Sequence, residues 1–540
     1  MAMSAEASKQ MLHDDAGSVD SDEAQLRAFG YSQILHRSWG QWENICASFC
    51  ALYFVGGIRY LYSVGIEAGG PPALWSSWLV TIVCSCITAA VLAEVCSSIP
   101  LSGSIYIWAA ECGGPKYGRL AGFVVAFWST TAWTSFLASI NQGTMNYLMS
   151  ELIVFNVDDR FLGGLETTNI YFRAVVWAGA EFFLWTALAV NWIPPRAFRW
   201  VFFVTAGVML LDWLLTLIWL PIGVSKTYGF QSSSFFTESY NGTAAPTGWN
   251  WLLSFLFTSG VLTGFDASGH VAEETKNASL TAARGIFWSC FASAFLGTPI
   301  IFLFLACSPS IEALFTLQAP QPFVLIYEQA LGRGGQVVMT VIAILGLWLN
   351  TVVVVIAASR LVFAIARDGV LPGSSWIGKV KRNGQPKNAV LFVGGIAGLI
   401  LCIILASPVA FTSLVSCGAM PTIAAYALIP FLRLFVSPGQ LKKARWSNGR
   451  FSKPFLWISM VWNTFLLSTL VSPYYFPVTA DTFNFTPVVF GAVTIFAFVA
   501  WLVVPESRWL SGRKIKEIRD NEAYTISGDS KGYRTDIPVE

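Results

Sequence analysis

Twelve apolar stretches of membrane-spanning length constrain this chain more than any other feature of its sequence. A helix needs about 20 consecutive apolar residues to cross the hydrocarbon core of a bilayer, and such stretches recur from Ile45 to Leu502. They predict an all-α polytopic membrane protein with twelve transmembrane helices. The expected spans are residues 45–66, 73–99, 120–148, 170–190, 197–220, 249–271, 285–307, 336–366, 390–406, 408–435, 455–471 and 488–503.

The composition excludes several classes of function. Only 12% of the residues are charged, against roughly 25% in a soluble domain, which rules out a soluble multidomain enzyme. The net charge of +2 is too small to indicate nucleic acid as a partner. Of the three histidines only His270 falls in an expected span, and the sequence has no Ser-His-Asp set, metal-ligand spacing or nucleotide-binding loop. We therefore expect no enzyme, no metal and no cofactor.

The Lys and Arg residues orient the chain, because positively charged loops stay on the cytoplasmic side. With the N-terminus inside, most of the 33 fall on the cytoplasmic side, and an even number of spans returns the C-terminus there. The plasma membrane is the expected location. Sequons at Asn241 and Asn484 then lie outside, where they are predicted glycosylation sites.

This orientation divides the chain into two tails, two groups of five spans and a final pair. The N-terminal tail is expected to include a short helix on the membrane surface at Asp22–Trp42, and the C-terminal tail carries basic residues at 513–519. The expected divisions are a cytoplasmic tail at 1–44, spans 1–5 at 45–222, an extracellular loop at 223–248, spans 6–10 at 249–435, spans 11 and 12 at 436–504, and a cytoplasmic tail at 505–540.

Two spans contain glycines beside a charge, a pattern that indicates an unwound helix. Span 1 carries Gly56 and Gly57 next to Arg59, and span 6 carries Gly264 next to Asp266. Glycine is a poor helix former, and a charge at membrane depth is costly unless it faces a cavity or a partner. Unwinding would free backbone groups to bind a small solute at the bilayer midplane. The alternative is that these glycines only allow helices to pack closely.

The positions of the two interruptions also indicate an internal repeat. They fall in the first and the sixth span, as expected for two repeats of five helices with two helices appended. Because each repeat has an odd number of spans, the second copy must be inverted, which is the architecture of many alternating-access transporters. The prediction is therefore a five-plus-five inverted repeat with broken helices 1 and 6.

Four segments resemble the amino acid-polyamine-organocation (APC) superfamily, and within it the fungal amino acid/choline transporter family. They are Gly65–Pro71 (GIEAGGP), Ala93–Ser104 (AEVCSSIPLSGS), Gly264–Ser279 (GFDASGHVAEETKNAS) and Ala358–Pro372 (ASRLVFAIARDGVLP). The resemblance implies the twelve-helix inverted-repeat fold and secondary active uptake of a small cationic or zwitterionic solute. It also implies a substrate site between broken helices 1 and 6, closed by helices 3, 8 and 10.

Carried onto this chain, the resemblance assigns the backbone of Val55, Gly56 and Gly57 to a substrate carboxylate. Thr263, Gly264 and Phe265 would face the amino or side-chain end of the substrate. In helices 3 and 8, Thr131 and Asn350 are candidates to line the cavity, although contacts between helices explain them equally well. Three further polar residues have the same two interpretations: Thr134, Ser413 and Ser416.

Asp266 and Arg59 carry the charges that decide the expected substrate. Asp266 either attracts a cationic group or changes protonation during transport; alternatively, it pairs permanently with Arg59. Arg59 departs from the small or apolar residue that the family often has there. A guanidinium would repel choline or a polyamine unless Asp266 neutralised it, but it can clamp a carboxylate with two hydrogen bonds. These charges favour an amino acid.

Other buried polar residues are candidates for ion coupling or for a gate. Proton coupling is favoured over sodium coupling, because Ala357 and Ala358 offer no side-chain oxygen beside Ser359. For the coupling candidates, the competing explanation is a hydrogen bond between helices. For the arginines, it is the ordinary excess of positive charge on the cytoplasmic side. The coupling candidates are Asp212, Glu181 and Ser359, and the gate candidates are Glu273, Glu274, Arg360 and Arg367.

The expected function is therefore secondary active import of an amino acid or a related small amine, coupled to protons. A permease for choline, thiamine or a polyamine remains an alternative, as does a nutrient receptor that binds without transporting. The expected partners are a small-molecule substrate, a proton and the lipid bilayer, and the sequence does not indicate an oligomeric state.

Overall fold

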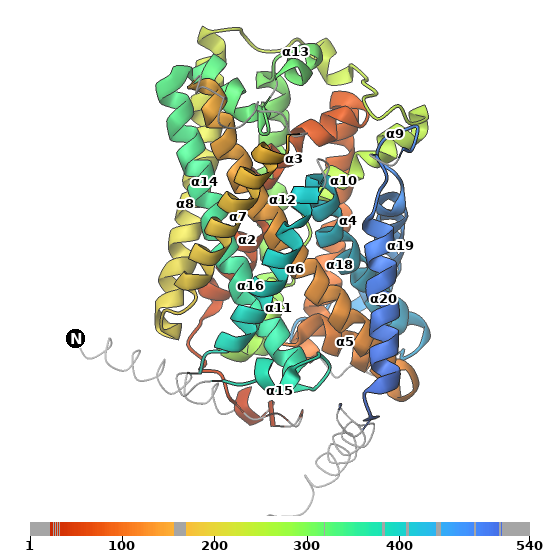
Figure 1. The fold of residues 1–540 in the computed structure, drawn as a ribbon. Coiled ribbons are helices and arrows are strands. Elements are labelled where there is room, and N and C mark those ends of the chain that lie inside the picture. Colours follow the sequence, from red (N-terminus) through yellow and green to blue (C-terminus); the bar gives the residue numbers. More distant parts are fainter. Residues whose placement is uncertain are drawn as a thin grey trace, which may run out of the picture.

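Long helices run side by side along one direction in the computed structural model of the chain (Figure 1). Eleven helical segments among the described residues are long and apolar enough to cross a membrane, and these residues form no strand beyond two isolated bridges. The description covers residues 22–24, 26–27, 29, 31, 33–155, 169–317, 319–380, 384–406, 410–438, 444–479, 482–506 and 509, without the side chains of 410–414.

Each of these eleven segments matches one predicted span, which confirms the all-α polytopic fold. Several are longer than predicted, because hydropathy detects only the apolar part of a helix and not its polar ends. The segments are α2 with α3 (Gln41–Leu52 and Phe54–Glu67), α4 (Gly70–Ser98), α6 (Gly114–Val154), α7 (Ile170–Val190), α8 (Phe198–Lys226), α12 (Ala278–Cys307), α14 (Pro322–Arg367), α16 with α17 (Lys387–Leu401 and Ile403–Ala406), α18 (Ala410–Phe435), α19 (Ser452–Val471) and α20 (Thr486–Val503).

The first span is broken as predicted, but the break lies at Tyr53 rather than at the glycine pair. Tyr53 has φ 35° and ψ 58°, in the left-handed region, and separates α2 from α3. Gly56 and Gly57 lie inside α3. A Cβ atom at Gly56 would collide with the ring of Tyr53. The glycine therefore makes room for the side chain of the break residue and does not itself unwind the helix.

The sixth span is broken where the sequence predicts it. Three short helices replace a continuous span: α9 (Thr247–Leu253), α10 (Phe255–Val261) and α11 (Ala267–His270). Between α10 and α11, Gly264 has φ 109°, a conformation that favours glycine over every residue with a Cβ atom. The three short helices are not among the eleven segments of membrane-spanning length, and together they account for the twelfth predicted span.

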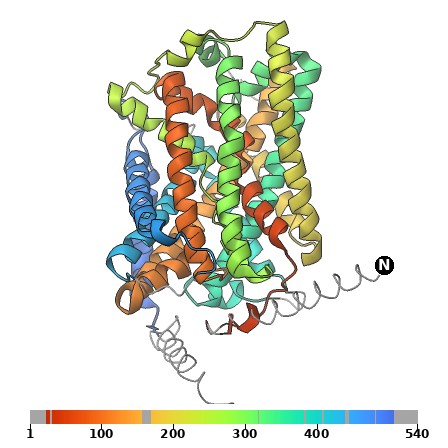
Figure 2. The same ribbon diagram turned by 180° about the vertical axis from the view of Figure 1, so that it is seen from behind.

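The two broken spans lie next to each other and run in opposite directions. α3 packs against α10, while α2 packs against α11, as expected for corresponding helices of an inverted repeat. Side chains of α2 hold the backbone around α11. Ser48 donates to the carbonyl of Phe265 at 2.8 Å, and Asn44 Nδ2 donates to the carbonyl of Ser268 at 3.2 Å. Figure 2 shows α12 between α4 and α8 on the opposite side of the bundle.

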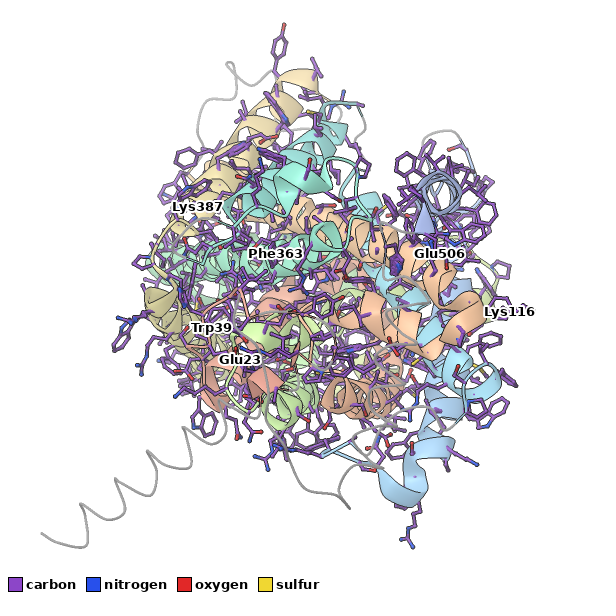
Figure 3. All side chains as sticks on the ribbon, turned by 90° about the horizontal axis from the view of Figure 1, so that it is seen from below. Glu23, Trp39, Lys116, Phe363, Lys387 and Glu506 are labelled. Atoms are coloured by element: carbon purple, nitrogen blue, oxygen red, sulfur yellow. The ribbon has the colours of Figure 1, made fainter. Side chains whose placement is uncertain are left out.

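Short elements cover the end of the bundle that carries α15 (Ser374–Ile377), called the α15 end below (Figure 1). One is α5 (Ser104–Cys112), which was not predicted. The N-terminal segment also packs here: residues 33–40 form no helix, and Trp39 is fully buried. Residues 33–40 therefore pack against the protein and do not form the membrane-surface helix expected at Asp22–Trp42. Figure 3 looks onto this end, with Phe363 near its middle and Lys116 at its rim.

The remaining short helices lie in the connections. They are α13 (Ile311–Thr316), η2 (Pro195–Ala197), η3 (Ser233–Thr237), η4 (Ala272–Glu274) and η5 (Gly449–Phe451). η4 follows α11 directly and so continues the sixth span towards the α15 end. The basic residues expected at 513–519 lie outside the described part of the chain.

Candidate functional site

A pocket lies between the two helix breaks, enclosed by α3, α6, α10, α14 and α18. It holds about 720 Å³ of empty space, counting its open mouth. Its walls are mostly aromatic, aliphatic or glycine residues, and none of the described residues that line it carries a charge. They are Leu52, Tyr53, Gly56, Gly57, Tyr60, Leu61, Ala132, Trp133, Phe136, Ser139, Ile140, Gly260, Thr263, Gly264, Leu347, Asn350, Val415, Gly418, Ala419 and Thr422.

Four aromatic rings dominate these walls: Tyr53, Tyr60, Trp133 and Phe136. Trp133 and Phe136 lie in contact on α6, with ring centroids 6.4 Å apart and planes at 81°. Gly418 lets α18 approach α6 closely, since a Cβ atom there would already lie 3.4 Å from the backbone of Phe136. The pocket is therefore an aromatic box whose polar groups are backbone atoms, hydroxyls and one amide.

That amide belongs to Asn350, which also stabilises the first helix break. Its Nδ2 atom donates to the carbonyls of Cys50 and Ala51, at 2.5 and 3.0 Å. These are among the last carbonyls of α2, which have no partner within the helix. Asn350 thus supplies hydrogen bonds that the left-handed turn at Tyr53 removes.

Five of the sequence candidates for the substrate site line this pocket: Gly56, Gly57, Thr263, Gly264 and Asn350. Two others, Val55 and Phe265, do not line the pocket but are neighbours of lining glycines in the sequence. Val55 is fully buried, and the ring of Phe265 stacks on the ring of Tyr426 with centroids 5.0 Å apart. Three more do not line the pocket: Thr131, Arg59 and Asp266.

Arg59 forms a buried cluster on one side of the pocket, called the guanidinium cluster here. Its Nη2 atom pairs with Asp212 Oδ2 of α8, and its Nη1 atom donates to the hydroxyl of Tyr327 at 2.9 Å. Tyr53 donates to Asp212 at 2.7 Å. Both charged side chains are fully buried. The expected alternative that Arg59 pairs with Asp266 is therefore wrong, because Asp212 occupies its guanidinium.

Asp266 forms a separate buried cluster on the other side, called the imidazole cluster here. Tyr426 of α18 donates to Asp266 Oδ1 at 2.6 Å. Asp266 Oδ2 lies 3.2 Å from His270 Nε2, one helical turn later. On the far side of the ring, His270 Nδ1 is 2.5 Å from Ser104 Oγ of α5. Trp133 packs edge-on against the imidazole with centroids 5.2 Å apart, so one ring separates this cluster from the pocket.

Four charged residues form a gate cluster between the pocket and the α15 end. Arg367 makes two hydrogen bonds to Glu273, at 2.8 and 3.0 Å, and Arg360 pairs with Glu274 at 2.7 Å. Burial would raise the pKa of Glu273, but Arg367 and the N–H of Ser102 hold it below its ordinary value. Burial dominates for Glu274 and raises its pKa, although Arg360 opposes this. The cluster joins η4 to α14 across the molecule.

The N-terminal segment fastens this gate cluster from outside. The amides of Ser38 and Trp39 donate to the carbonyl of Glu274, at 3.0 and 3.1 Å. Tyr31 lies over the guanidinium of Arg367 at 4.2 Å and donates to Asp368 at 3.0 Å. Burial raises the pKa of Asp368, against the opposing effect of Arg367. These contacts join the N-terminal segment to η4 and to the end of α14.

Other sequence candidates lie away from the pocket. Glu181 accepts from Trp185 on its own helix at 2.9 Å, and Ser359 accepts from its neighbour Arg360 at 3.1 Å. Ser416 lines a second, smaller cavity, and Thr134 donates to a carbonyl within α6. The side chain of Ser413 lies outside the described part of the chain.

Both predicted glycosylation asparagines use their Nδ2 atoms in the fold. Asn241 donates to the carbonyl of Ala245 at 2.8 Å. Asn484 donates to the carbonyls of Leu470 and Ser472, at 2.9 and 2.8 Å. A glycan attached at either atom would compete with these bonds, and modification at the two sites stays a prediction.

The sequence interpretation missed the aromatic box and two partners of Asp266. Tyr53, Tyr60, Trp133 and Phe136 carry no motif, and aromatic residues make up 15% of the chain. For His270 a signal was present, because no other histidine falls in a predicted span. Its spacing of four residues from Asp266 places both side chains on one helical face.

The family comparison extends over most of the chain. The family model described as amino acid permease matches residues 40–495. The chain belongs to this amino acid permease family. Among similar proteins, the thiamine transporter thi9 of Schizosaccharomyces pombe is 46% identical over 520 residues, covering 92% of this permease and 87% of the relative. The amino-acid permease BAT1 of Arabidopsis thaliana is 25% identical over 504 residues, covering 92% and 96%.

Membership confirms the resemblance noted in the sequence and two of its implications. The chain is a multi-pass membrane permease for a small molecule, and its relatives are transporters rather than enzymes. The permeases that resemble it differ in the solutes that their names give. The identity of the permeant must therefore be argued from the pocket.

Proposed function

We propose that this permease carries thiamine or a closely similar heteroaromatic cation, coupled to protons, through the pocket between the two helix breaks. The observation that carries the proposal is a pocket between the two helix breaks with four aromatic rings and no charged lining residue. Thiamine contains two flat aromatic rings, and the positive charge of its thiazolium is permanent and delocalised. Aromatic faces attract such a charge without a carboxylate.

The position of Arg59 removes the main argument for an amino acid as the preferred substrate. That argument needed a free guanidinium to clamp the substrate carboxylate. Arg59 is instead buried and paired with Asp212, so its charge neither repels a cation nor offers hydrogen bonds to a carboxylate. The relative named as a thiamine transporter supports the same choice, since it is 46% identical over nearly the whole chain.

The proposed direction of transport is import across the plasma membrane, with the α15 end in the cytoplasm. The balance of Lys and Arg supports this orientation. The gate cluster would then separate the pocket from the cytoplasm. Proton coupling is supported by the buried titratable groups of the imidazole cluster, and a sodium site is disfavoured because Ser359 already contacts Arg360.

Uptake of labelled thiamine into proteoliposomes tests the proposal. We expect saturable uptake that Trp133→Leu weakens, because a desolvated cation–π contact contributes about 2 kcal/mol, or roughly 30-fold in Kd. Trp128→Leu is the matched control, since Trp128 lies on the same helix but donates to Thr494 on α20, away from the pocket. Equal losses in the two variants would contradict the aromatic box.

An amino acid remains the second candidate, because the free backbone groups at the two helix breaks can bind a carboxylate and an ammonium group. Competition against labelled thiamine separates the two. We expect excess thiamine and other thiazolium compounds to block uptake, while neutral, acidic and basic amino acids, choline and putrescine do not. Transport of an amino acid with no effect of thiamine would contradict the proposal. Saturable binding without uptake would indicate a receptor.

A further inference from the structure

We propose that His270 and Asp266 together bind the proton that drives transport, an inference that rests on the proposed proton-coupled uptake of a heteroaromatic cation. The two side chains are fully buried and lie one helical turn apart in the sixth span. Their facing atoms, His270 Nε2 and Asp266 Oδ2, are 3.2 Å apart, yet neither has a hydrogen-bond partner among the described residues.

The other polar atoms of the pair have partners within hydrogen-bond distance. Tyr426 donates to Asp266 Oδ1. Ser104 Oγ lies next to His270 Nδ1, which occupies that ring nitrogen. While His270 is neutral, the ring proton lies either on Nδ1 or on Nε2, and in both tautomers the buried pair keeps the uncompensated charge of Asp266, which is unfavourable in a buried site. A proton that binds to the bare ring nitrogen forms a second N–H bond and leaves a histidine–carboxylate ion pair with no net charge.

No other charge in the neighbourhood competes for this role. Each charged group of the gate cluster has its own partner, and the phenol of Tyr106 bonds to Asp368. The pair therefore depends on its own proton for neutrality. The titratable or charged groups on the elements packed against α11, and on α18, are Glu43, Cys46 and Cys50 of α2, Tyr106, Glu111 and Cys112 of α5, Glu273 and Glu274 of η4, Arg284, Cys290 and Cys307 of α12, Tyr327, Glu328, Arg333, Arg360 and Arg367 of α14, and Cys417, Tyr426 and Arg433 of α18.

The position of the pair links the proton to both the pocket and the gate. Gly264 lines the pocket two residues before Asp266, and Trp133 contacts both the pocket and the imidazole. Glu273 of the gate cluster follows His270 by three residues. The pair holds its proton in the arrangement with the gate closed. When α11 and η4 move to open the gate, the contact is lost and the proton leaves towards the α15 end with the substrate.

Two measurements on His270→Gln in proteoliposomes test this inference. Exchange of external labelled thiamine against internal thiamine needs no net proton movement, whereas accumulation driven by an imposed pH gradient does. We expect His270→Gln to keep exchange within about threefold of wild type and to lose accumulation. His13→Gln is the matched control, because His13 precedes all of the predicted spans in the sequence, and it should behave as wild type in both assays.

The outcomes distinguish this inference from the proposed function. Wild-type protein that exchanges no thiamine would overturn the proposed substrate. Wild-type exchange with undiminished pH-driven accumulation in His270→Gln would overturn the role of the pair. If His270→Gln loses exchange as well, Ser104→Ala decides. Loss of the Nδ1 partner should move the pH midpoint of uptake to lower pH than in the wild type, because the imidazolium loses a hydrogen-bond acceptor. An unchanged midpoint would overturn the inference.

Discussion

The two buried carboxylates of this permease have opposite partners. Asp212 faces the guanidinium of Arg59, which keeps its charge at every accessible pH. Asp266 faces the imidazole of His270, a side chain that exists in a neutral and a charged form. Each carboxylate also accepts from a tyrosine hydroxyl, Tyr53 or Tyr426. One carboxylate therefore has a partner with a permanent charge, and the other has a partner whose charge depends on a bound proton.

We infer from this difference that the guanidinium cluster stabilises the fold, whereas the imidazole cluster binds the coupling proton. In the guanidinium cluster the charges of α3 and α8 cancel permanently, and breaking such a buried pair costs about 3–5 kcal/mol. In the imidazole cluster a neutral substitute can replace either partner without leaving a permanent charge unpaired. We therefore expect substitutions in the first cluster to reduce the stability of the protein and those in the second to affect coupling.

The largest effect is expected for Asp212→Asn. It leaves the guanidinium of Arg59 buried beside a neutral amide, so the free energy of unfolding should fall by about 3–5 kcal/mol. Thermal unfolding of the purified protein in detergent measures this. The double substitution Arg59→Leu with Asp212→Leu removes both charges and should recover most of the loss. If Asp212→Asn alone were as stable as the wild type, the proposed difference between the two clusters would be wrong.

Asp266→Asn should have a smaller effect on stability and a specific effect on transport. The amide oxygen still accepts from Tyr426, so we expect unfolding within about 1 kcal/mol of the wild type. Accumulation of thiamine against its gradient should be lost, while exchange is retained. Unfolding and proteoliposome assays on one preparation measure both quantities. Loss of stability equal to that of Asp212→Asn would show that the two clusters have the same role.

Substitutions in the gate cluster should act locally. Glu273→Gln removes the charge that accepts two hydrogen bonds from Arg367, and charge-assisted bonds of this kind contribute about 1.5–3 kcal/mol. We expect amide hydrogen exchange in α11, η4 and residues 33–39 to accelerate by roughly tenfold or more, since 1.4 kcal/mol corresponds to tenfold. Exchange in α3 and α8 serves as the internal control. Uniform acceleration would indicate global destabilisation instead.

The smallest effect is expected from mild acidification of the gate cluster. The pKa of Glu274 is raised and that of Glu273 is lowered, so Glu274 takes up a proton first as the pH falls. The Glu273 pair contributes stability above the ordinary pKa of a glutamate and loses it only as the pH falls through the lowered value. Infrared titration of the carboxyl bands in Glu273→Gln and Glu274→Gln should show the Glu274 band appearing at the higher pH. The reverse order would contradict these contacts.

Much of the fold, but less of the site, could be predicted from the sequence. Apolar length fixes the number of spans, and the glycines locate the break at Gly264, where φ is positive. The first break was placed a few residues late, because Tyr53 adopts a left-handed conformation that a non-glycine residue rarely takes. The partner of Arg59 could not be found from spacing, since Asp212 lies 153 residues away. Such contacts depend on which helices become neighbours.

The break at Tyr53 has one further consequence for how the molecule moves. A single residue, Tyr53, joins α2 to α3, and this junction is called the hinge below. The half beyond the hinge is anchored to α8 through Arg59 and Asp212, and Tyr53 is itself tied to the same carboxylate. The half before it is tied to α11 through Ser48 and Asn44. A displacement of α11 would therefore be transmitted to α2 through these two hydrogen bonds.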